Sequence, residues 1–333
     1  MTKEYYEENY KNGELQDCAA FDMGYIAFIL KDIPQTDEDI EYSELPTYLI
    51  AYVPENNKLG EFATVEWGRG IEQAYVSGTH RYPIVLDQIF DINEIKSRTG
   101  WYPIPNNERG SLAKGMTNID GEVYAYGMVR SVFKRTGVKA WENITTEEKH
   151  PNLYADVNKS KSTFVGDFVG FSALDGFNAN DIYAGGNQGD FWHYNGKEWR
   201  RIDLPINSDI STITCGKDGR VYVGSRIGNV VVGKGNSWEV LKSRTYEMTH
   251  SCWFEGKVYF SSQDGRIYTY DETKKDLVEA EFKTSYPKHM HYLIRGIASC
   301  EECLVAYTSV QAYAYDGEVW YEVIEIPSLS KHQ

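Results

Sequence analysis

The stretch NDIYAGGNQGDFWHYNGKEW, residues 180–199, decides the fold class of this chain. It contains two short runs rich in apolar and aromatic residues, separated by a Gly-containing turn, and an Asn-Gly pair then leads to a tryptophan. The same order of residues returns as DGRVYVGSRIGNVVVGKGNSW at 218–238 and, in shorter form, as EGKVYFSSQDGRIYTYD at 255–271. This repetition predicts a sheet architecture built from β-hairpin modules.

The repeats align on a tyrosine that follows Val or Ile, at Tyr124, Tyr183, Tyr222 and Tyr259. The last three lie 39 and 37 residues apart in the sequence, which is the period of one four-stranded propeller blade. Each repeat divides into a strand of small residues, the strand with the aligned tyrosine, a third strand and an outer strand. The outer strands carry the tryptophans at positions 199, 238 and 320.

The first strand of each repeat suits the innermost position of a blade. Inner strands converge around a narrow channel, so small side chains are expected there. The residues that meet this demand are Thr212, Thr214, Thr249, Ser251, Gly296 and Ala298. The aligned tyrosines and tryptophans are expected to fill the wedges between blades, where each aromatic side chain buries about 150–250 Å².

The sequence therefore predicts an all-β fold, a single β-propeller of four-stranded antiparallel blades, with seven blades preferred and six possible. One domain is expected over residues 1–333, with an acidic arm at 1–19, degenerate blades at 20–114 and regular blades at 115–327. Residues 143–162 are expected to form an exposed insertion, and LDQIFDINEIKSR at 86–98 a short helix or insertion. A closed ring leaves no free sheet edge.

The formal net charge of the chain is −15, which argues against nucleic acid or an anionic membrane as a partner. Residues 1–70 contain 15 acidic and 5 basic residues, a net charge of −10. The densest acidic run comprises Asp37, Glu38, Asp39, Glu41 and Glu44. This run is either a solvated loop or a docking surface for a cationic protein.

The five cysteines form a sparse, odd-numbered set. The first residues show no secretory signal, and no apolar run reaches a membrane-spanning length. These features predict a reduced, cytoplasmic protein. Cys300 and Cys303 form a single CxxC motif without a second ligand pair, so we expect two ordinary cysteines at a strand–turn junction rather than a zinc or redox site.

No catalytic residue and no cofactor are expected. His289 and His291 would share one face of an extended strand and could join His250 at a metal, but surface histidines on a long loop explain the pattern more simply. Patterns of the GxSxG, HExxH and phosphate-loop types are absent from the sequence. The string SSQDGRIY at 261–268 departs from the sialidase Asp-box, because Gly265 comes one residue too early.

Long connections between repeats supply the candidate partner-binding residues. RTYEMTH at 244–250 and TSYPKHMHYLIR at 284–295 are expected to link an outer strand to the next inner strand. Together with the acidic run, the candidates are Tyr246, Met248, His250, Tyr286, His289, His291 and Tyr292. Tyrosine and methionine supply contact area at protein interfaces, and they equally pack beneath their own loop.

The repeat consensus resembles bacterial WD40-like and Kelch-like propellers, including immunity proteins encoded beside secreted toxins. It is carried by residues 180–199, 218–238 and AYAYDGEVW at 312–320, without the WD and GH signatures of true WD40 repeats. The resemblance implies a non-enzymatic module of a toxin–antitoxin type, which binds and neutralises a toxin domain. The excess of negative charge predicts that this domain is basic, and a monomer is expected. The alternative is a propeller glycosidase or other glycan-processing enzyme that acts at the channel mouth.

Overall fold

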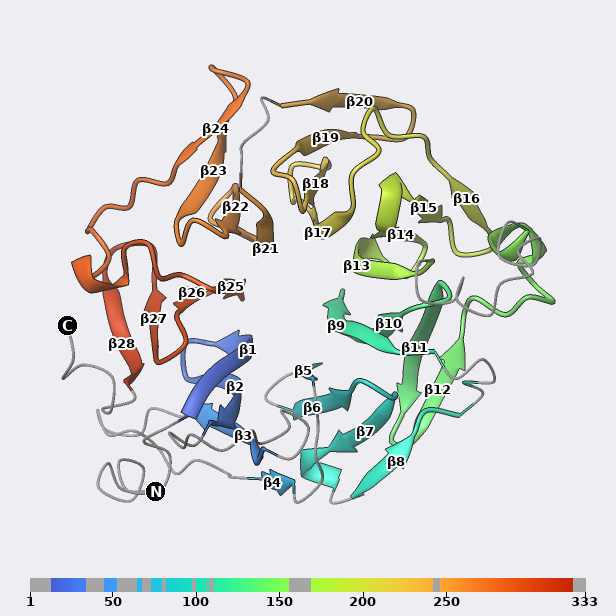
Figure 1. Ribbon diagram of the computed structural model, residues 1–333, viewed down its shortest axis with the longest axis horizontal. Coiled ribbons are helices and arrows are strands. Elements are labelled where there is room, and N and C mark those ends of the chain that lie inside the picture. The colour runs from blue at the N-terminus through green and yellow to red at the C-terminus, as the bar shows by residue number, and fades with distance from the viewer. Residues whose placement is uncertain are drawn as a thin grey trace.

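Alternating apolar and polar residues, interrupted by Gly-containing turns, produce strands throughout the chain. The computed structural model describes residues 13–33, 45–52, 65–67, 73–79, 82–97, 100–105, 107, 111–155, 169–241 and 246–325. Within these ranges 28 strands form seven sheets, each made of four strands consecutive in the sequence. The sheets surround a central axis as the blades of a propeller (Figure 1). The predicted all-β propeller with seven blades is confirmed.

Each blade runs from its inner to its outer strand in chain order. Blades 1 to 4 comprise β1 (Gly13–Asp22), β2 (Tyr25–Asp32), β3 (Thr47–Tyr52) and β4 (Val65–Trp67); β5 (Ala74–Thr79), β6 (Tyr82–Asp87), β7 (Asp91–Glu94) and β8 (Trp101–Pro103); β9 (Ala113–Ile119), β10 (Glu122–Gly127), β11 (Ser131–Gly137) and β12 (Ala140–Asn143); and β13 (Phe171–Asn178), β14 (Asp181–Gly186), β15 (Phe191–Tyr194) and β16 (Trp199–Arg201).

Blades 5 to 7 comprise β17 (Ile210–Cys215), β18 (Val221–Ser225), β19 (Val230–Lys234) and β20 (Ser237–Val240); β21 (Met248–Phe254), β22 (Lys257–Ser262), β23 (Ile267–Asp271) and β24 (Asp276–Glu279); and β25 (Gly296–Ser299), β26 (Leu304–Tyr307), β27 (Gln311–Tyr315) and β28 (Trp320–Glu325). The short helices of the described part are 3-10 turns, namely η2 (Ile95–Ser97), η3 (Pro151–Tyr154), η6 (Asn187–Gly189) and η7 (Lys288–Met290). None of the described helices has the length and apolar character needed to span a membrane.

The hairpin turns set the register between neighbouring strands. Asp120 and Gly121 have φ of 50° and 83°, and positive φ at both central residues is the requirement of a type I′ turn. Ile119 therefore pairs with Glu122 across the turn from β9 to β10. The twist of such a turn matches the twist of the strands that it joins.

The hydrophobic core is divided among the junctions between blades. Seven clusters of buried side chains each combine residues of two neighbouring blades, and one of them joins blade 7 to blade 1. Tyr183 illustrates the aromatic contribution, because it stacks on Phe191 in its own blade and meets Trp238 of blade 5 edge-on at 6.4 Å between ring centroids. The predicted wedge role of the repeated aromatic residues is confirmed.

The small residues of the inner strands connect one blade to the next. The hydroxyl of Ser251 on β21 lies 2.5 Å from that of Thr212 and 2.6 Å from that of Thr214, both on β17. Larger side chains at these positions would separate the inner strands. The expected placement of the small-residue strands around the axis is confirmed (Figure 1).

The degenerate blades differ in detail from the sequence expectation. Residues 86–98 contain the third strand of blade 2, β7, followed by η2, so the prediction of a helix or insertion was wrong for Asp91–Glu94. Strand β1 begins at Gly13, inside the segment expected to be an acidic arm. Leu153 and Tyr154 of η3 are buried, so this part of the segment predicted as an exposed insertion packs against the core.

Chain direction gives the propeller two different faces. The connections from outer to inner strands and the turns between second and third strands lie at the same ends of the blades, because neighbouring strands are antiparallel. We call this side the connector face. The opposite side carries the turns between first and second strands and between third and fourth strands, and we call it the turn face.

Candidate protein-interaction face

Exposed apolar side chains gather on the connector face over blades 5 to 7. Ile227 lies in the turn between β18 and β19 and is 60% exposed, and Tyr246 precedes β21 and is 48% exposed. Tyr292 and Leu293 precede β25 and are 62% and 46% exposed. Large apolar groups at these exposures can add contact area on burial against a partner.

Backbone hydrogen bonds hold the loops of this region side by side. The N–H of Gln263, in the turn after β22, donates to the carbonyl of Glu247 at 2.8 Å. The N–H of Ile294 donates to the carbonyl of Gly265 at 3.3 Å. The turn of blade 6 thus contacts the connections on both sides of it, which brings Tyr246 and Tyr292 onto one continuous surface.

Tyr292 is fixed in an outward position. Its backbone has φ of 65°, a conformation that bulky residues adopt only at a cost of about 1–3 kcal/mol. The guanidinium of Arg266 donates a hydrogen bond to the Tyr292 hydroxyl at 2.8 Å and lies 4.5 Å from the centroid of its ring. A tyrosine held in this way loses little further freedom when a partner covers it.

Met248 and Tyr286 lie in the core, although both were candidates for partner binding. Met248 is fully buried between blades 5 and 6, and Tyr286 is buried between blades 6 and 7. Both side chains pack beneath their own loops, which was the alternative expected for tyrosine and methionine in these connections. Neither side chain is exposed on the connector face, so these two residues are no longer candidates for contact with a partner.

The three candidate histidines have separate surroundings. Residues 288–290 form η7 rather than a strand, so His289 and His291 do not share the face of an extended segment. His289 Nε2 lies 3.1 Å from the Tyr313 hydroxyl, and the His291 ring stacks on Tyr286 at 4.4 Å between centroids. In the described ranges no group of three or more His, Cys, Asp and Glu side chains is arranged to hold a metal ion.

His250 lies on the inner strand β21, away from the surface loops. Its ring meets Tyr307 of blade 7 edge-on at 6.1 Å between centroids. Burial lowers the pKa of His250 to about 4, although a hydrogen bond with the Arg295 backbone acts in the opposite direction. The imidazole is therefore neutral at physiological pH, and it faces the neighbouring blades rather than a partner.

Several of the charged groups around the candidate surface form ion pairs. Ion pairs join Arg226 Nε to Glu247 Oε1 at 3.9 Å, Arg266 Nη1 to Glu279 Oε2 at 3.3 Å and Arg295 Nη1 to Glu14 Oε2 at 2.8 Å. The acidic candidates Asp37, Glu38, Asp39, Glu41 and Glu44 lie outside the described residues. The described part of the surface thus combines apolar centres with locally balanced charge.

A second apolar pair lies on the connector face at the junction of blades 2 and 3. Ile89 is 55% exposed and Leu112 is 43% exposed. The N–H of Ala113 donates to the carbonyl of Gln88 at 2.8 Å, which holds the loops of these two residues together. The connector face therefore has apolar contact points on both sides of the ring.

The inner strands also carry two carboxyl groups whose pKa is well above the usual value for aspartate. Burial raises the pKa of Asp17 and of Asp175 to about 7, against the opposing effect of hydrogen bonds from the backbone. Asp17 accepts the N–H groups of Val76 and Cys18 at 2.8 and 2.9 Å. Asp175 accepts those of Cys215 and Gly176 at 2.7 and 2.8 Å. Both oxygens of each carboxylate thus bind the backbone, which gives these groups a structural role.

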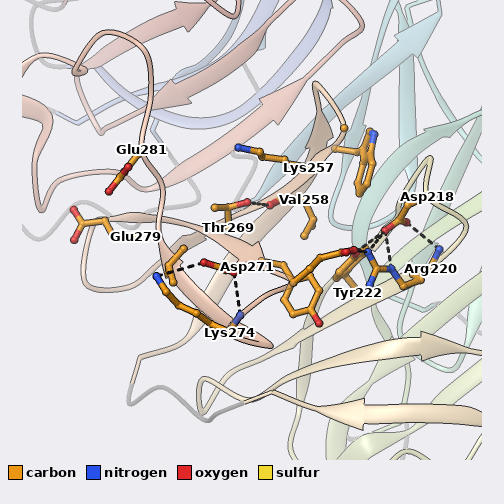
Figure 2. Close-up of a pocket in the computed structure, with 15 residues that line it drawn as sticks. Asp218, Arg220, Tyr222, Lys257, Val258, Thr269, Asp271, Lys274, Glu279 and Glu281 are labelled. Carbon is orange, nitrogen blue, oxygen red and sulfur yellow. Dashed lines mark hydrogen bonds and ion pairs between the residues drawn. The ribbon is translucent and has the colours of Figure 1, made fainter.

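A pocket of about 470 Å³ lies between blades 5 and 6, toward the turn face. Figure 2 shows Asp218, Arg220 and Tyr222 at one end, Glu279 and Glu281 at the other, and Asp271 with Lys274 between them. Burial favours the protonated form of Asp218, but hydrogen bonds from Tyr222 and Arg220 hold its pKa below the usual value. The backbone N–H of Lys274 lowers the pKa of Asp271.

These titration properties bear on the alternative of glycan hydrolysis. A glycosidase needs a carboxylic acid that stays protonated until it donates to the leaving group. Asp218 and Asp271 shift in the opposite direction, and Arg220 bridges Asp218 and Glu272 while it lies over the rings of Tyr222 and Tyr270. The polar groups at this end of the pocket satisfy one another.

Sequence reasoning singled out Tyr246 and Tyr292 as candidate contact residues and placed Arg266 in a neighbouring turn of the same face, but it missed Ile227 and Leu293 as parts of this surface. Ile227 follows Arg226 in a turn where polar residues are the norm, and this isolated apolar residue was an available signal. Leu293 was part of the quoted connection, next to Tyr292. The contact between Arg266 and Tyr292 joins residues of two loops, and pairing across loops leaves no mark in a single sequence.

Known proteins that are similar to this chain support its fold, and the name of one of them indicates a class of function. No protein-family model matches the chain. The chain is similar to a protein of Pseudomonas aeruginosa named Immune protein Tsi7, with 30% identity over 217 residues, which is 65% of this chain and 65% of that protein. The match thus spans slightly less than two thirds of the relative's length.

Solved structures show the same architecture at low sequence identity. The WD40 propeller domain of Doa1 matches with a TM-score of 0.60 and 9% identity, over 90% of each chain. The WD40 repeats of RRP9 match with a TM-score of 0.60 and 13% identity, over 89% of this chain and 87% of that one. The computationally designed protein Ika8 matches with a TM-score of 0.55 and 11% identity, over 94% and 96%. These likenesses concern the fold alone, and they confirm its WD40-like character.

Proposed function

We propose that this chain is a non-enzymatic immunity protein, which binds a protein toxin through its connector face and holds the toxin inactive. The similarity to a protein named Immune protein Tsi7 supports the immunity role. The observation that carries the choice of face is the exposed group of Ile227, Tyr246, Tyr292 and Leu293 on loops that touch one another.

The physical properties of this group suit a protein interface. Tyrosine held rigid by Arg266 provides a large contact area at small entropic cost, and Leu293 and Ile227 extend the apolar area. The surrounding ion pairs form a polar rim, such as interfaces place around their apolar centre. Binding energy is expected to come from burial of the apolar side chains.

The proposed partner is a basic toxin domain. The net charge of −15 favours association with a cationic protein. Because Arg266 and Arg295, which lie near Tyr292, are held in ion pairs with carboxylates, the attraction is assigned to the charge of the whole molecule. Its main effect is expected on the association rate and on selectivity. The proposed setting is the cytoplasm, where such a protein would meet a toxin delivered into the cell, and the proposed free form is a monomer.

Co-expression tests this function directly. The reading frames next to the gene of this chain are searched for a secreted toxin, the chain is produced together with the C-terminal domain of that toxin, and both growth of the host and recovery of a complex are measured. We expect the chain to restore growth and to co-purify with the toxin domain. Absence of both the complex and the protection would overturn the proposal, whereas cleavage of a glycan by the isolated chain would favour the enzymatic alternative.

A further inference from the structure

The turn between β25 and β26 brings two cysteine sulfurs into contact. Cys300 and Cys303 lie at the two ends of the sequence CEEC, which we call the CEEC turn. The distance between their sulfur atoms is 3.4 Å. The backbone N–H of Cys300 donates to the carbonyl of Cys303 at 3.0 Å, so the two residues face each other across the hairpin. The predicted position of the two cysteines at a strand–turn junction is confirmed. The contact between their sulfur atoms was not predicted from the sequence.

The two thiols have different surroundings. Cys303 is completely buried, whereas Cys300 is half-buried. The geometry allows either sulfur to donate the hydrogen bond between the two thiols. With the Cys303 thiol as the donor, this bond lowers the pKa of Cys300 to about 7, and the N–H groups of Glu302 and Cys303 act in the same direction. Burial of Cys300 and the charge of Glu302 oppose this effect. The same sulfur–sulfur hydrogen bond, together with burial, raises the pKa of Cys303.

The remaining cysteines have no such activation. Burial raises the pKa of Cys18, Cys215 and Cys252. The titratable neighbours of Cys300 are Cys303, Glu302 and Cys18. Because a thiolate is the reactive form of cysteine, Cys300 is expected to react first.

We propose that the CEEC turn is a redox modification site, at which small-molecule disulfides oxidise Cys300 and Cys303 to an intramolecular disulfide. The Cys300 thiolate attacks one sulfur of the small disulfide, and its other half leaves as a thiolate. Cys303 then attacks the Cys300 sulfur in the mixed disulfide, its proton passes to the departing second half, and that half leaves as a thiol. In total, two protein thiols are oxidised to one disulfide, and one small disulfide is reduced to two thiols.

The CEEC turn contacts two other blades of the ring, and formation of the disulfide does not require these contacts to break. The carboxylate of Glu302 accepts the N–H of Met23 in blade 1 at 3.0 Å, and Glu301 pairs with Lys217 of blade 5 at 3.1 Å. These contacts hold the turn from both sides. The sulfurs must approach to the bonding distance of about 2.0 Å, which rotation of the two side chains can provide while the hairpin backbone stays paired.

The test uses the reduced full-length chain and oxidised glutathione at pH 7. After reaction, free thiols are alkylated and the peptide that contains both cysteines is analysed by mass spectrometry. The wild-type peptide is expected to lose two hydrogens and to retain no glutathione. In Cys303→Ser the reaction is expected to stop with glutathione on Cys300, and in Cys300→Ser the buried Cys303 is expected to stay unmodified.

Cys215→Ser is the matched control, because it removes a partly exposed thiol on another blade, and this variant is expected to form the disulfide like the wild type. Circular dichroism verifies that each variant is folded. The proposal is overturned if Cys303→Ser accumulates no adduct on Cys300, or if glutathione attaches to Cys215 as fast as to Cys300.

A second measurement tests whether the reactivity of Cys300 comes from its lowered pKa or only from its exposure to solvent. Alkylation of Cys300 is expected to be about tenfold faster than that of Cys215 at pH 7, since thiolate content controls the rate. Cys303→Ala removes the donor to the Cys300 sulfur and is expected to slow the reaction several-fold, whereas the hydroxyl of Cys303→Ser preserves part of the effect. Equal rates for Cys300 in the wild type and in Cys303→Ala would contradict the assigned geometry.

Discussion

The carboxylate of Asp175 on β13 accepts the backbone N–H of Cys215 on β17 at 2.7 Å, so a side chain joins the inner strands of neighbouring blades. Asp17 on β1 binds the N–H of Val76 on β5 in the same manner. Within the described residues, the four-stranded sheets pair strands of the same blade, and one isolated antiparallel bridge, between Met128 and Gly170, connects blades 3 and 4. These carboxylates therefore add polar contacts to the junctions between blades, which also contain hydrophobic packing, hydroxyl contacts such as Ser251 with Thr212, and ion pairs such as Arg130 with Asp190.

Removal of one such contact is expected to destabilise the fold. Asp175→Ala leaves the N–H groups of Cys215 and Gly176 without their acceptor and is expected to lower the free energy of unfolding by about 1–3 kcal/mol. Urea titration followed by tryptophan fluorescence measures this change. Asp203→Ala, at a side chain that is 97% exposed, is the control and should change stability by less than about 0.5 kcal/mol. Equal effects of the two substitutions would refute the role of Asp175.

The same carboxylates predict a pH dependence of stability. Their pKa is raised from about 4 in an unfolded chain to about 7 in the folded protein, so unfolding releases protons between these values. The stabilisation that these two carboxyl groups give the folded state is fully present below about pH 4, and it is lost as the pH rises to about 7. In Asp17→Asn/Asp175→Asn, the unfolding free energy should fall less over this range than in the wild type. A steeper fall in the variant would reverse the assigned sign.

A buried ion pair provides a further prediction. Arg130 in blade 3 donates from Nε and Nη2 to the two carboxylate oxygens of Asp190 in blade 4, at 2.7 and 3.0 Å. Arg130→Met leaves the carboxylate without this partner and is expected to cost about 3–5 kcal/mol of unfolding free energy. Arg226→Met, at an exposed pair with Glu247, should cost less than about 1 kcal/mol. Thermal and urea unfolding of both variants check this, and similar losses would contradict the prediction.

The salt dependence of association tests the proposed basic partner. With the net charge of −15 attracting a cationic toxin domain, raising NaCl from about 0.05 to 0.5 M is expected to slow association at least about tenfold through screening. Dissociation should change much less, because it depends on the apolar contacts. Stopped-flow mixing of the chain with the toxin domain measures both rates. An association rate that does not fall with salt would count against a basic partner.

The architecture could be predicted because propeller blades repeat a local pattern. The tyrosines of the second strands, the small residues of the first strands and the Gly turns recur at a fixed period, and each has its own physical reason. Blade 2 was harder to recognise, because β7 reads as Asp-Ile-Asn-Glu and carries only one large apolar residue. Its Glu94 is nevertheless buried, where it pairs with Arg135 of blade 3, and such pairing between distant residues is not visible in a local pattern.

The candidate surface could be predicted in part. Loop tyrosines are exposed at positions 246 and 292 but buried at 286, where the ring of Phe282 and the indole of Trp320 surround the side chain. These neighbours come from β28 and from the loop after β24, and the sequence does not reveal that they meet. The exposure of a loop residue depends on such contacts between segments, whereas the position of the loop follows from the repeat.

The most direct test of the account uses isothermal titration calorimetry to measure the affinity of matched variants for the toxin domain that the wild-type chain neutralises in co-expression. Tyr292→Ala/Leu293→Ala alters the proposed contact surface, whereas Tyr321→Ala removes another exposed tyrosine, which is 46% exposed on the outer strand β28. The account predicts that the first variant weakens binding by about 100-fold, while the second leaves Kd within about twofold of the wild type. Unchanged affinity in Tyr292→Ala/Leu293→Ala, with the variant correctly folded, would contradict binding through the connector face.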